Sequence, residues 1–143
     1  MLKITPAYTT SATATGGRDG HSRSEDGSID VTMASPTELG GSGKGNNPEQ
    51  LFATGYAACY LGAMKFATTL DATLAKVPND ATVKASVSIG GRPDRGFGLA
   101  VALEVTLPGV DHAEAVRVAD AGHTICPYSH AVNGNIEVTT TVV

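Results

Sequence analysis

The chain of 143 residues is expected to adopt an α+β fold with antiparallel sheets, as a single domain over residues 1–143. Strand-like segments come in runs, and two helical patterns separate these runs in the order β-β-β-α-β-β-α-β. The length matches one domain, and 41% hydrophobic residues are enough to build a core.

The first third of the chain is expected to be β structure. Its strand patterns cover residues 8–15, 21–25 and 29–33. Glycines on both sides of Arg18 end the first pattern, and Asp26-Gly27 is a hairpin signal between the other two. Residues 35–45 are rich in glycine and are expected to form a loop.

A long helix is expected from Pro48 to about Leu70. Asn47 can serve as its N-cap, Pro48 suits the first helical position, and Gln50 completes a capping-box arrangement. Because the segment is apolar all round, the helix is expected to be buried. One face carries small residues that let another backbone approach closely, in the series Gly55, Cys59, Gly62 and Phe66.

The second half of the chain alternates between strand and helix patterns. The expected elements are strands over 81–90 and 99–107, a helix over 111–123 and a last strand over 135–143. Pro127 is expected to end the second helix and to hold Cys126 in an extended conformation, because proline restricts the residue before it.

Composition excludes several classes of function. A net charge of −4, aromatic residues at 5% and the absence of tryptophan argue against a nucleic-acid surface. The N-terminal residues lack the apolar core of a signal peptide, and the longest apolar run is too short to cross a bilayer. We therefore expect a cytoplasmic protein that binds neither nucleic acid nor membrane.

Cys59 and Cys126 are the only cysteines. Structural disulfides are rare in the cytoplasm, so this pair is expected to be catalytic, metal-binding or inert. A cysteine on an apolar helix, as at Cys59, is more often a small buried hydrophobe than a nucleophile. Two thiols can also form a redox couple, in which one becomes a sulfenic acid and the second captures it as a disulfide.

A metal site is a weaker alternative. Cys59, His123, Cys126 and His130 are the residues that such a Cys₂His₂ site would use. The spacing lacks the paired cysteines typical of a zinc knuckle, so the pattern is a poor zinc signal.

Short segments in order along nearly the whole chain carry a family pattern. They are residues 14–20, 38–41, 47–53, 55–59, 96–99, 126–129 and 134–136. Together they resemble the Ohr/OsmC family of thiol-dependent hydroperoxide reductases, and more closely its organic hydroperoxide resistance branch. The resemblance implies antiparallel sheets packed around a buried central helix, in an intertwined homodimer.

The resemblance also implies the chemistry. Cys59 corresponds to the peroxidatic cysteine, Cys126 to the resolving cysteine, and Arg18 and Glu49 complete the site. The implied substrates are alkyl or fatty-acid hydroperoxides, the implied reductant is a dithiol on a lipoylated protein, and no cofactor is needed. An arginine suits this role because it stays charged and can hold a thiolate by charge and hydrogen bond.

Two further expectations concern the geometry of the site. Apolar side chains at Phe52, Phe97, Ile125 and Tyr128 are candidates for the wall of a substrate pocket. Glu49 and Cys59 lie ten residues apart on one expected helix, which is about 15 Å along its axis. Either Arg18 bridges that gap, or Glu49 reaches the site from a second copy of the chain.

Alternative functions are an OsmC-branch peroxidase, a cysteine redox sensor without turnover, and a zinc-stabilised structural domain.

Overall fold

The computed structural model describes residues 2–143, which form two compact units, residues up to Pro48 and Glu49–Val143. None of the helices in residues 2–143 combines the length and the apolar character that crossing a bilayer requires.

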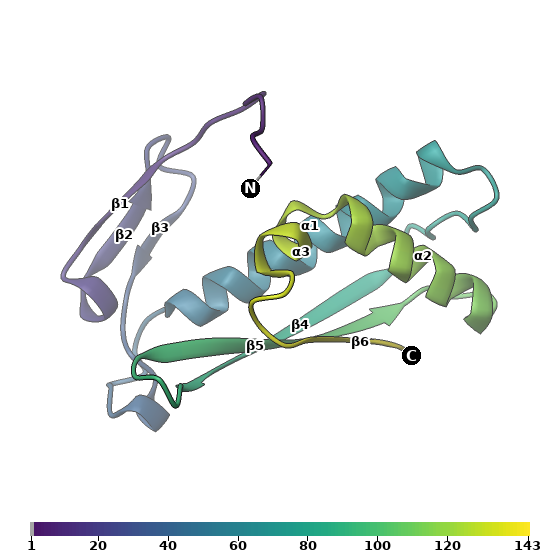
Figure 1. Cartoon of the computed structure of the whole chain (residues 1–143). Coiled ribbons are helices and arrows are strands. Elements are labelled where there is room, and N and C mark those ends of the chain that lie inside the picture. Colours follow the sequence, from purple (N-terminus) through teal and green to yellow (C-terminus); the bar gives the residue numbers. More distant parts are fainter. Residues whose placement is uncertain (1) are drawn as a thin grey trace. The chain divides into compact units, whose positions relative to one another are not determined.

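The first unit contains a small antiparallel sheet in the order β1-β2-β3 (Figure 1). Its strands are β1 (Ala12–Thr15), β2 (His21–Ser24) and β3 (Asp30–Thr32). The three strands were all predicted, but β1 is shorter than the pattern over 8–15. Tyr8, the one large apolar side chain in that pattern, is 81% exposed, so burial does not hold the early residues in a strand.

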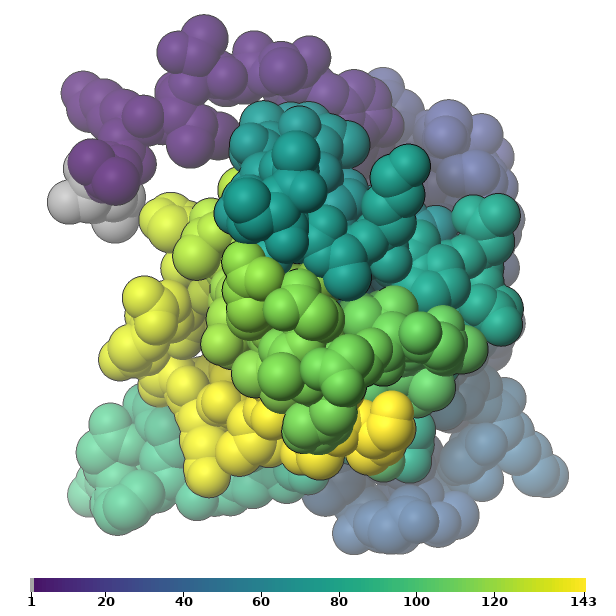
Figure 2. Space-filling model, turned by 90° about the vertical axis from the view of Figure 1, so that its right-hand side faces the viewer, coloured from purple at the N-terminus to yellow at the C-terminus, as the bar shows by residue number. Residues whose placement is uncertain are grey.

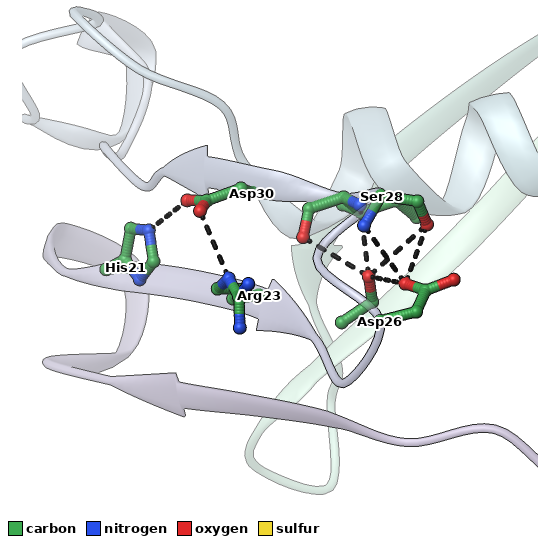
Figure 3. A network of polar contacts seen from close by, with 7 residues as sticks. His21, Arg23, Asp26, Ser28 and Asp30 are labelled. Atoms are coloured by element: carbon green, nitrogen blue, oxygen red, sulfur yellow. Dashed lines mark hydrogen bonds and ion pairs between the residues drawn. The ribbon is translucent and has the colours of Figure 1, made fainter.

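The hairpin between β2 and β3 forms at the predicted Asp26-Gly27 (Figure 3). Gly27 has a φ of 73°, which glycine adopts without strain. The Asp26 carboxylate accepts hydrogen bonds from the Ser24 hydroxyl and from the backbone and hydroxyl of Ser28, and these lower its pKa to about 2. The hairpin is thus closed by local side-chain bonds rather than by a core.

Beside this sheet the chain makes two short 3₁₀ turns, η1 (Gly17–Asp19) and η2 (Thr37–Leu39). The second lies within the predicted loop over 35–45. Asp19 links the two regions, because its carboxylate accepts a hydrogen bond of 3.2 Å from the backbone of Ser35. Arg18 therefore sits in a turn whose next residue is held in place.

The long helix α1 (Pro48–Leu70) has the predicted bounds, and all of it after Pro48 belongs to the second unit. A long hairpin follows, with β4 (Thr82–Gly91) antiparallel to β5 (Phe97–Thr106). The last strand, β6 (Val138–Val142), pairs with β5 in parallel. The prediction of purely antiparallel sheets is therefore wrong for β6. The two helices between β5 and β6 carry the chain back along the sheet, and such a crossover permits parallel pairing.

These two helices are α2 (His112–Ile125) and α3 (Pro127–Val132). The helix α2 starts after Asp111, whose carboxylate caps the backbone N–H of Ala113 at 3.1 Å. The helix α3 was not predicted. Pro127 does end α2, but it also occupies the first turn of α3, a position that proline favours.

All three helices lie on one face of the sheet β4–β5–β6, and the core fills the space between (Figure 1). From α1 it includes Tyr56, Tyr60, Ala63 and Met64, from β5 Val101, Leu103 and Val105, and from α2 Ala115, Val118 and Ala119. Figure 2 shows α2 (green) and β6 (yellow) beside each other at the surface of this unit. The core thus joins α1 and α2 to the central strand.

The expectation that α1 is buried all round is wrong within the described chain. One face of α1 is in the core, but the opposite face carries exposed apolar residues, which we call the α1 outer face. It consists of Leu51, Ala58, Gly62, Phe66 and Leu70. Phe66 is 54% exposed and Leu70 is 65% exposed. The helix is more apolar than its contacts in one chain require.

Candidate active site

The two cysteines meet at one point of the second unit. Cys59 comes from the middle of α1 and Cys126 from the corner between α2 and α3. Both are free thiols, and the Cys126 Sγ–Cys59 Sγ distance is 3.6 Å. A disulfide bond is about 2.0 Å long, so the two sulfurs would need to approach each other by about 1.6 Å. The two sulfurs are in van der Waals contact.

The corner holds Cys126 in the predicted extended conformation, with φ of −66° and ψ of 118°. Its backbone N–H closes the last turn of α2 on the Gly122 carbonyl. Its sulfur is fully buried and caps α3, accepting a hydrogen bond of 3.4 Å from the Ser129 backbone N–H. The resolving thiol predicted from the sequence is thus a fixed part of the helix corner.

Cys59 is only partly buried. Burial raises the pKa of its thiol, a hydrogen bond from the Tyr128 backbone N–H acts in the opposite direction, and the neighbouring Cys126 thiol adds to the rise. The surroundings of Cys59 in this unit therefore favour the neutral thiol. Because only the thiolate is a good nucleophile, a reactive Cys59 needs a cationic partner.

Aromatic side chains cover the corner. The ring of Tyr128 lies 5.8 Å from that of Phe52 and 5.7 Å from that of Tyr56, measured between centroids. Gly55 makes this approach possible, because a Cβ there would come within 2.9 Å of the Tyr128 hydroxyl. A Cβ at Gly62 would meet no atom of residues 2–143 within 4 Å. On the face of α1 that carries small residues, Tyr128 therefore packs at the Gly55 end and not at the Gly62 end.

The four residues expected to line a pocket differ in their contacts and in their exposure. Phe52 and Tyr128 contact each other, with ring centroids 5.8 Å apart. Ile125 packs against the core. Phe97 begins β5 and is 71% exposed. The pocket remains a prediction, and among its four expected residues Phe52 and Tyr128 have rings that contact each other.

A polar network beside the cysteines was missed by the sequence analysis. The Ser129 Oγ lies 3.0 Å from the Tyr56 hydroxyl and 2.9 Å from His123 Nδ1, and His123 Nε2 lies 2.8 Å from Thr140 Oγ1. Burial lowers the pKa of His123, so the imidazole is neutral at neutral pH. The network joins α1, α2, α3 and β6 around one buried serine.

A hollow of about 530 Å³ opens next to this network. Its lining includes Tyr56, His123, Ser129, His130, Asn133 and Ile136.

The remaining two predicted site residues come from other elements of the chain. Glu49 is in the first turn of α1, where its charge suits the helix dipole. It precedes Cys59 by ten residues on the same helix, which is about 15 Å along the axis. Arg18 lies in η1 of the other unit and is described only within that unit. Among residues 2–143, no cluster of three metal-binding side chains forms, and the zinc set stays without support.

Comparison with known proteins identifies the class. The model of the OsmC-like protein family matches residues 41–141. The chain therefore belongs to the OsmC-like family.

Its relatives identify the branch. The organic hydroperoxide resistance protein of Xanthomonas axonopodis pv. citri is 49% identical over 136 residues, covering 94% of each chain. The crystal structure of an organic hydroperoxide resistance protein from Elizabethkingia anophelis has a TM-score of 0.89 at 41% identity, covering 97% of this chain and 98% of that one. The protein OhrB of Bacillus subtilis has a TM-score of 0.85 at 35% identity, covering 96% and 100%. The predicted α+β fold of the Ohr/OsmC family and the predicted branch are confirmed, and the homodimer stays a prediction.

Proposed function

We propose that the chain is a thiol-dependent peroxidase that reduces organic hydroperoxides to alcohols in defence against oxidative stress. The relatives named organic hydroperoxide resistance proteins support this function. The observation that carries the mechanism is the Cys126 Sγ–Cys59 Sγ distance of 3.6 Å between two free thiols. Two thiols at this distance are suited to a catalytic cycle through a disulfide.

The proposed cycle balances in three steps. The Cys59 thiolate attacks the O–O bond, takes the outer oxygen as a sulfenic acid and releases the alkoxide, which leaves as the alcohol. The Cys126 thiol then attacks the sulfenic sulfur, and its proton leaves with the hydroxyl group as water. An external dithiol reduces the Cys59–Cys126 disulfide and is itself oxidised. The family resemblance supports a lipoylated protein as this dithiol.

Arg18 and Glu49 have supporting roles in this proposal. Burial raises the pKa of Cys59, so a guanidinium that holds the thiolate makes the nucleophile available. The same group stabilises the alkoxide as negative charge moves to the leaving oxygen. Glu49 pairs with Arg18 and orients it.

The substrate is proposed to be bulky or fatty rather than hydrogen peroxide. The Tyr128 backbone N–H bonds to Cys59 and the Tyr128 ring packs against Phe52, so these two rings are candidates for the apolar surface that a substrate would contact. A hydroperoxide with an alkyl chain gains from burial on such a surface, whereas hydrogen peroxide has no carbon to bury.

Turnover assays test the function. With reduced lipoamide as the dithiol, we expect rapid consumption of an alkyl hydroperoxide and slower consumption of hydrogen peroxide, and weaker support from thioredoxin. Stoichiometric oxidation of the thiols without turnover would instead identify a redox sensor. Absence of any reaction would contradict the proposal and would favour a test for zinc binding.

A cytoplasmic location is part of the same proposal, because the enzyme needs a dithiol reductant.

The Arg18 role predicts a change in the first step alone. Arg18→Ala is expected to slow Cys59 oxidation by about a hundredfold or more, because the thiolate loses its cation and the leaving oxygen its donor. Arg18→Lys is expected to retain part of the rate, since it keeps the charge but not the planar fork. Rapid mixing of reduced protein with one equivalent of hydroperoxide measures the step. An unchanged rate in Arg18→Ala would remove this residue from the site.

We further propose that two copies of the chain assemble through the α1 outer face, and that each copy supplies its Glu49 to the active site of the other. The exposed apolar side chains of that face support a second copy as the occupant. The separation of about 15 Å between Glu49 and Cys59 along α1 supports supply of the carboxylate in trans.

Mixed dimers test the exchange. Glu49→Ala and Cys59→Ser chains are each expected to be inactive as homodimers. Coexpression of the two chains is expected to restore about a quarter of the parent activity, since half of the dimers then carry one complete site of two. If Glu49 acts within its own chain, the mixed dimers hold no complete site and stay inactive.

A further inference from the structure

The first turn of α3 is hydrogen-bonded to α1 beside the two cysteine sulfurs. Ser129 takes part in three hydrogen bonds there. Its backbone N–H donates to Cys126 Sγ, and its hydroxyl bonds to Tyr56 on α1 and to His123 on α2. Tyr56 lies one turn before Cys59 on α1. One buried side chain therefore links the element that carries Cys126 to the element that carries Cys59.

The hydrogen-bonding capacity of this network is filled in one consistent direction. A neutral imidazole has one donor and one acceptor. The bonds are satisfied when Tyr56 donates to Ser129, Ser129 donates to His123 Nδ1, and His123 Nε2–H donates to Thr140. Tyr56 is fully buried and Ser129 is 7% exposed, so both hydroxyls need partners within the protein, and they have them in each other and in His123. The corner is consequently rigid rather than merely packed.

Rigidity at this point matters for the second step of the proposed cycle. Once Cys59 is a sulfenic acid, attack by Cys126 competes with a second hydroperoxide that converts it to a sulfinic acid. Attack within the protein depends steeply on the position of the attacking atom, and a misplacement of about 1 Å can cost a hundredfold in rate. The sulfurs start 3.6 Å apart, which is close to contact.

We propose that Ser129, held by Tyr56 and His123, is a positioning residue for the resolving step. It keeps Cys126 within reach of the oxidised Cys59, and so decides whether the enzyme forms its disulfide or is over-oxidised. This inference rests on the proposed peroxidase function. It predicts an effect on disulfide formation that is separate from the reactivity of Cys59 towards hydroperoxide.

Two tyrosines on α1 provide a matched test. Tyr56→Phe removes the hydroxyl that binds Ser129 and keeps the ring. Tyr60→Phe removes an equally buried hydroxyl that does not bond to Ser129. This hydroxyl donates to the Ala119 carbonyl on α2 at 2.7 Å and also bonds to Thr140, while the variant keeps the ring that lies 4.5 Å from that of His123. Reduced proteins are mixed with tert-butyl hydroperoxide, and the loss of the Cys59 thiol and the appearance of the disulfide are followed separately by quenching and intact mass.

We expect Tyr56→Phe to slow disulfide formation by about tenfold to a hundredfold while Cys59 oxidation changes by less than about twofold. Sulfinic acid at Cys59 should increase in proportion as hydroperoxide is raised. Tyr60→Phe should resemble the parent in both steps. Ser129→Ala should show a larger defect than Tyr56→Phe, and if it does not fold, the tyrosine pair decides the question.

The outcomes separate this inference from the function on which it rests. If the parent protein does not oxidise at Cys59, the peroxidase proposal fails. If the parent forms its disulfide and Tyr56→Phe forms it equally fast, the function stands and the role of Ser129 is refuted. An equal slowing in Tyr60→Phe would also refute it, because that variant keeps the bond between Tyr56 and Ser129.

Discussion

Replacement of Cys59 by serine is expected to abolish hydroperoxide turnover. The hydroxyl of serine is isosteric with the thiol but is not ionised near neutral pH, so the attack on the O–O bond has no nucleophile. Removal of a nucleophile from a comparable enzyme costs several orders of magnitude, and we expect a loss of at least about a thousandfold here. Steady-state consumption of an alkyl hydroperoxide with reduced lipoamide measures it.

Cys126 cannot replace Cys59 in that variant, because it is fully buried, whereas Cys59 is partly exposed. Circular dichroism and the melting temperature serve as controls for folding. The substitution is close to isosteric and Cys59 is only half-buried, so we expect both to match the parent protein closely. Retained turnover in a folded Cys59→Ser protein would show that the assignment of the peroxidatic cysteine is wrong.

Replacement of Cys126 by serine is expected to leave the first step intact and remove the second. Cys59 should still be oxidised by the first equivalent of hydroperoxide, since the variant keeps the nucleophile. The sulfenic acid then has no thiol at 3.6 Å to condense with, and further hydroperoxide converts it to sulfinic acid. Inactivation should therefore increase with hydroperoxide concentration, and intact mass should show added oxygen rather than a disulfide.

The parent protein is the control for that experiment, because it should lose both thiols and gain no oxygen under the same treatment. Trapping with a sulfenic-acid reagent should label Cys59 in Cys126→Ser and label the parent only briefly. A Cys126→Ser protein that turns over for as long as the parent would mean that Cys126 does not resolve the intermediate.

Much of the fold followed from local signals in the sequence. Pro48 marks the start of α1, and Asp26-Gly27 marks the hairpin, because both act through backbone conformation that neighbouring residues cannot override. The errors concern relations between distant segments. The parallel direction of β6 depends on the path of the two helices before it, and no residue within β6 encodes it. The short helix α3 was hidden because Pro127 was interpreted only as the end of α2.

The exposed face of α1 illustrates a different limit of prediction from sequence. Apolar residues around the whole helix predicted burial, and the pattern does not distinguish a core within one chain from a surface that a second copy covers. Phe66 shows the difference, because it is 54% exposed in the single chain. The exposure supports the proposed assembly more directly than the pattern does.

The candidate site was predictable in its residues more than in its geometry. Cys59 and Cys126 were identified by the family resemblance, but their separation of 3.6 Å required the structure. The Ser129 junction was missed because its members come from four elements and each is ordinary alone. A serine three residues after a helix-capping cysteine was the one available signal, and it is a weak one.

Titration of the reduced protein with one equivalent of an alkyl hydroperoxide, without reductant, is the most direct test of the central claim. The proposed mechanism predicts that both thiols disappear together, that a Cys59–Cys126 disulfide is found by peptide mapping, and that one equivalent of alcohol is released. Two thiols that remain free after exposure to hydroperoxide would contradict the mechanism.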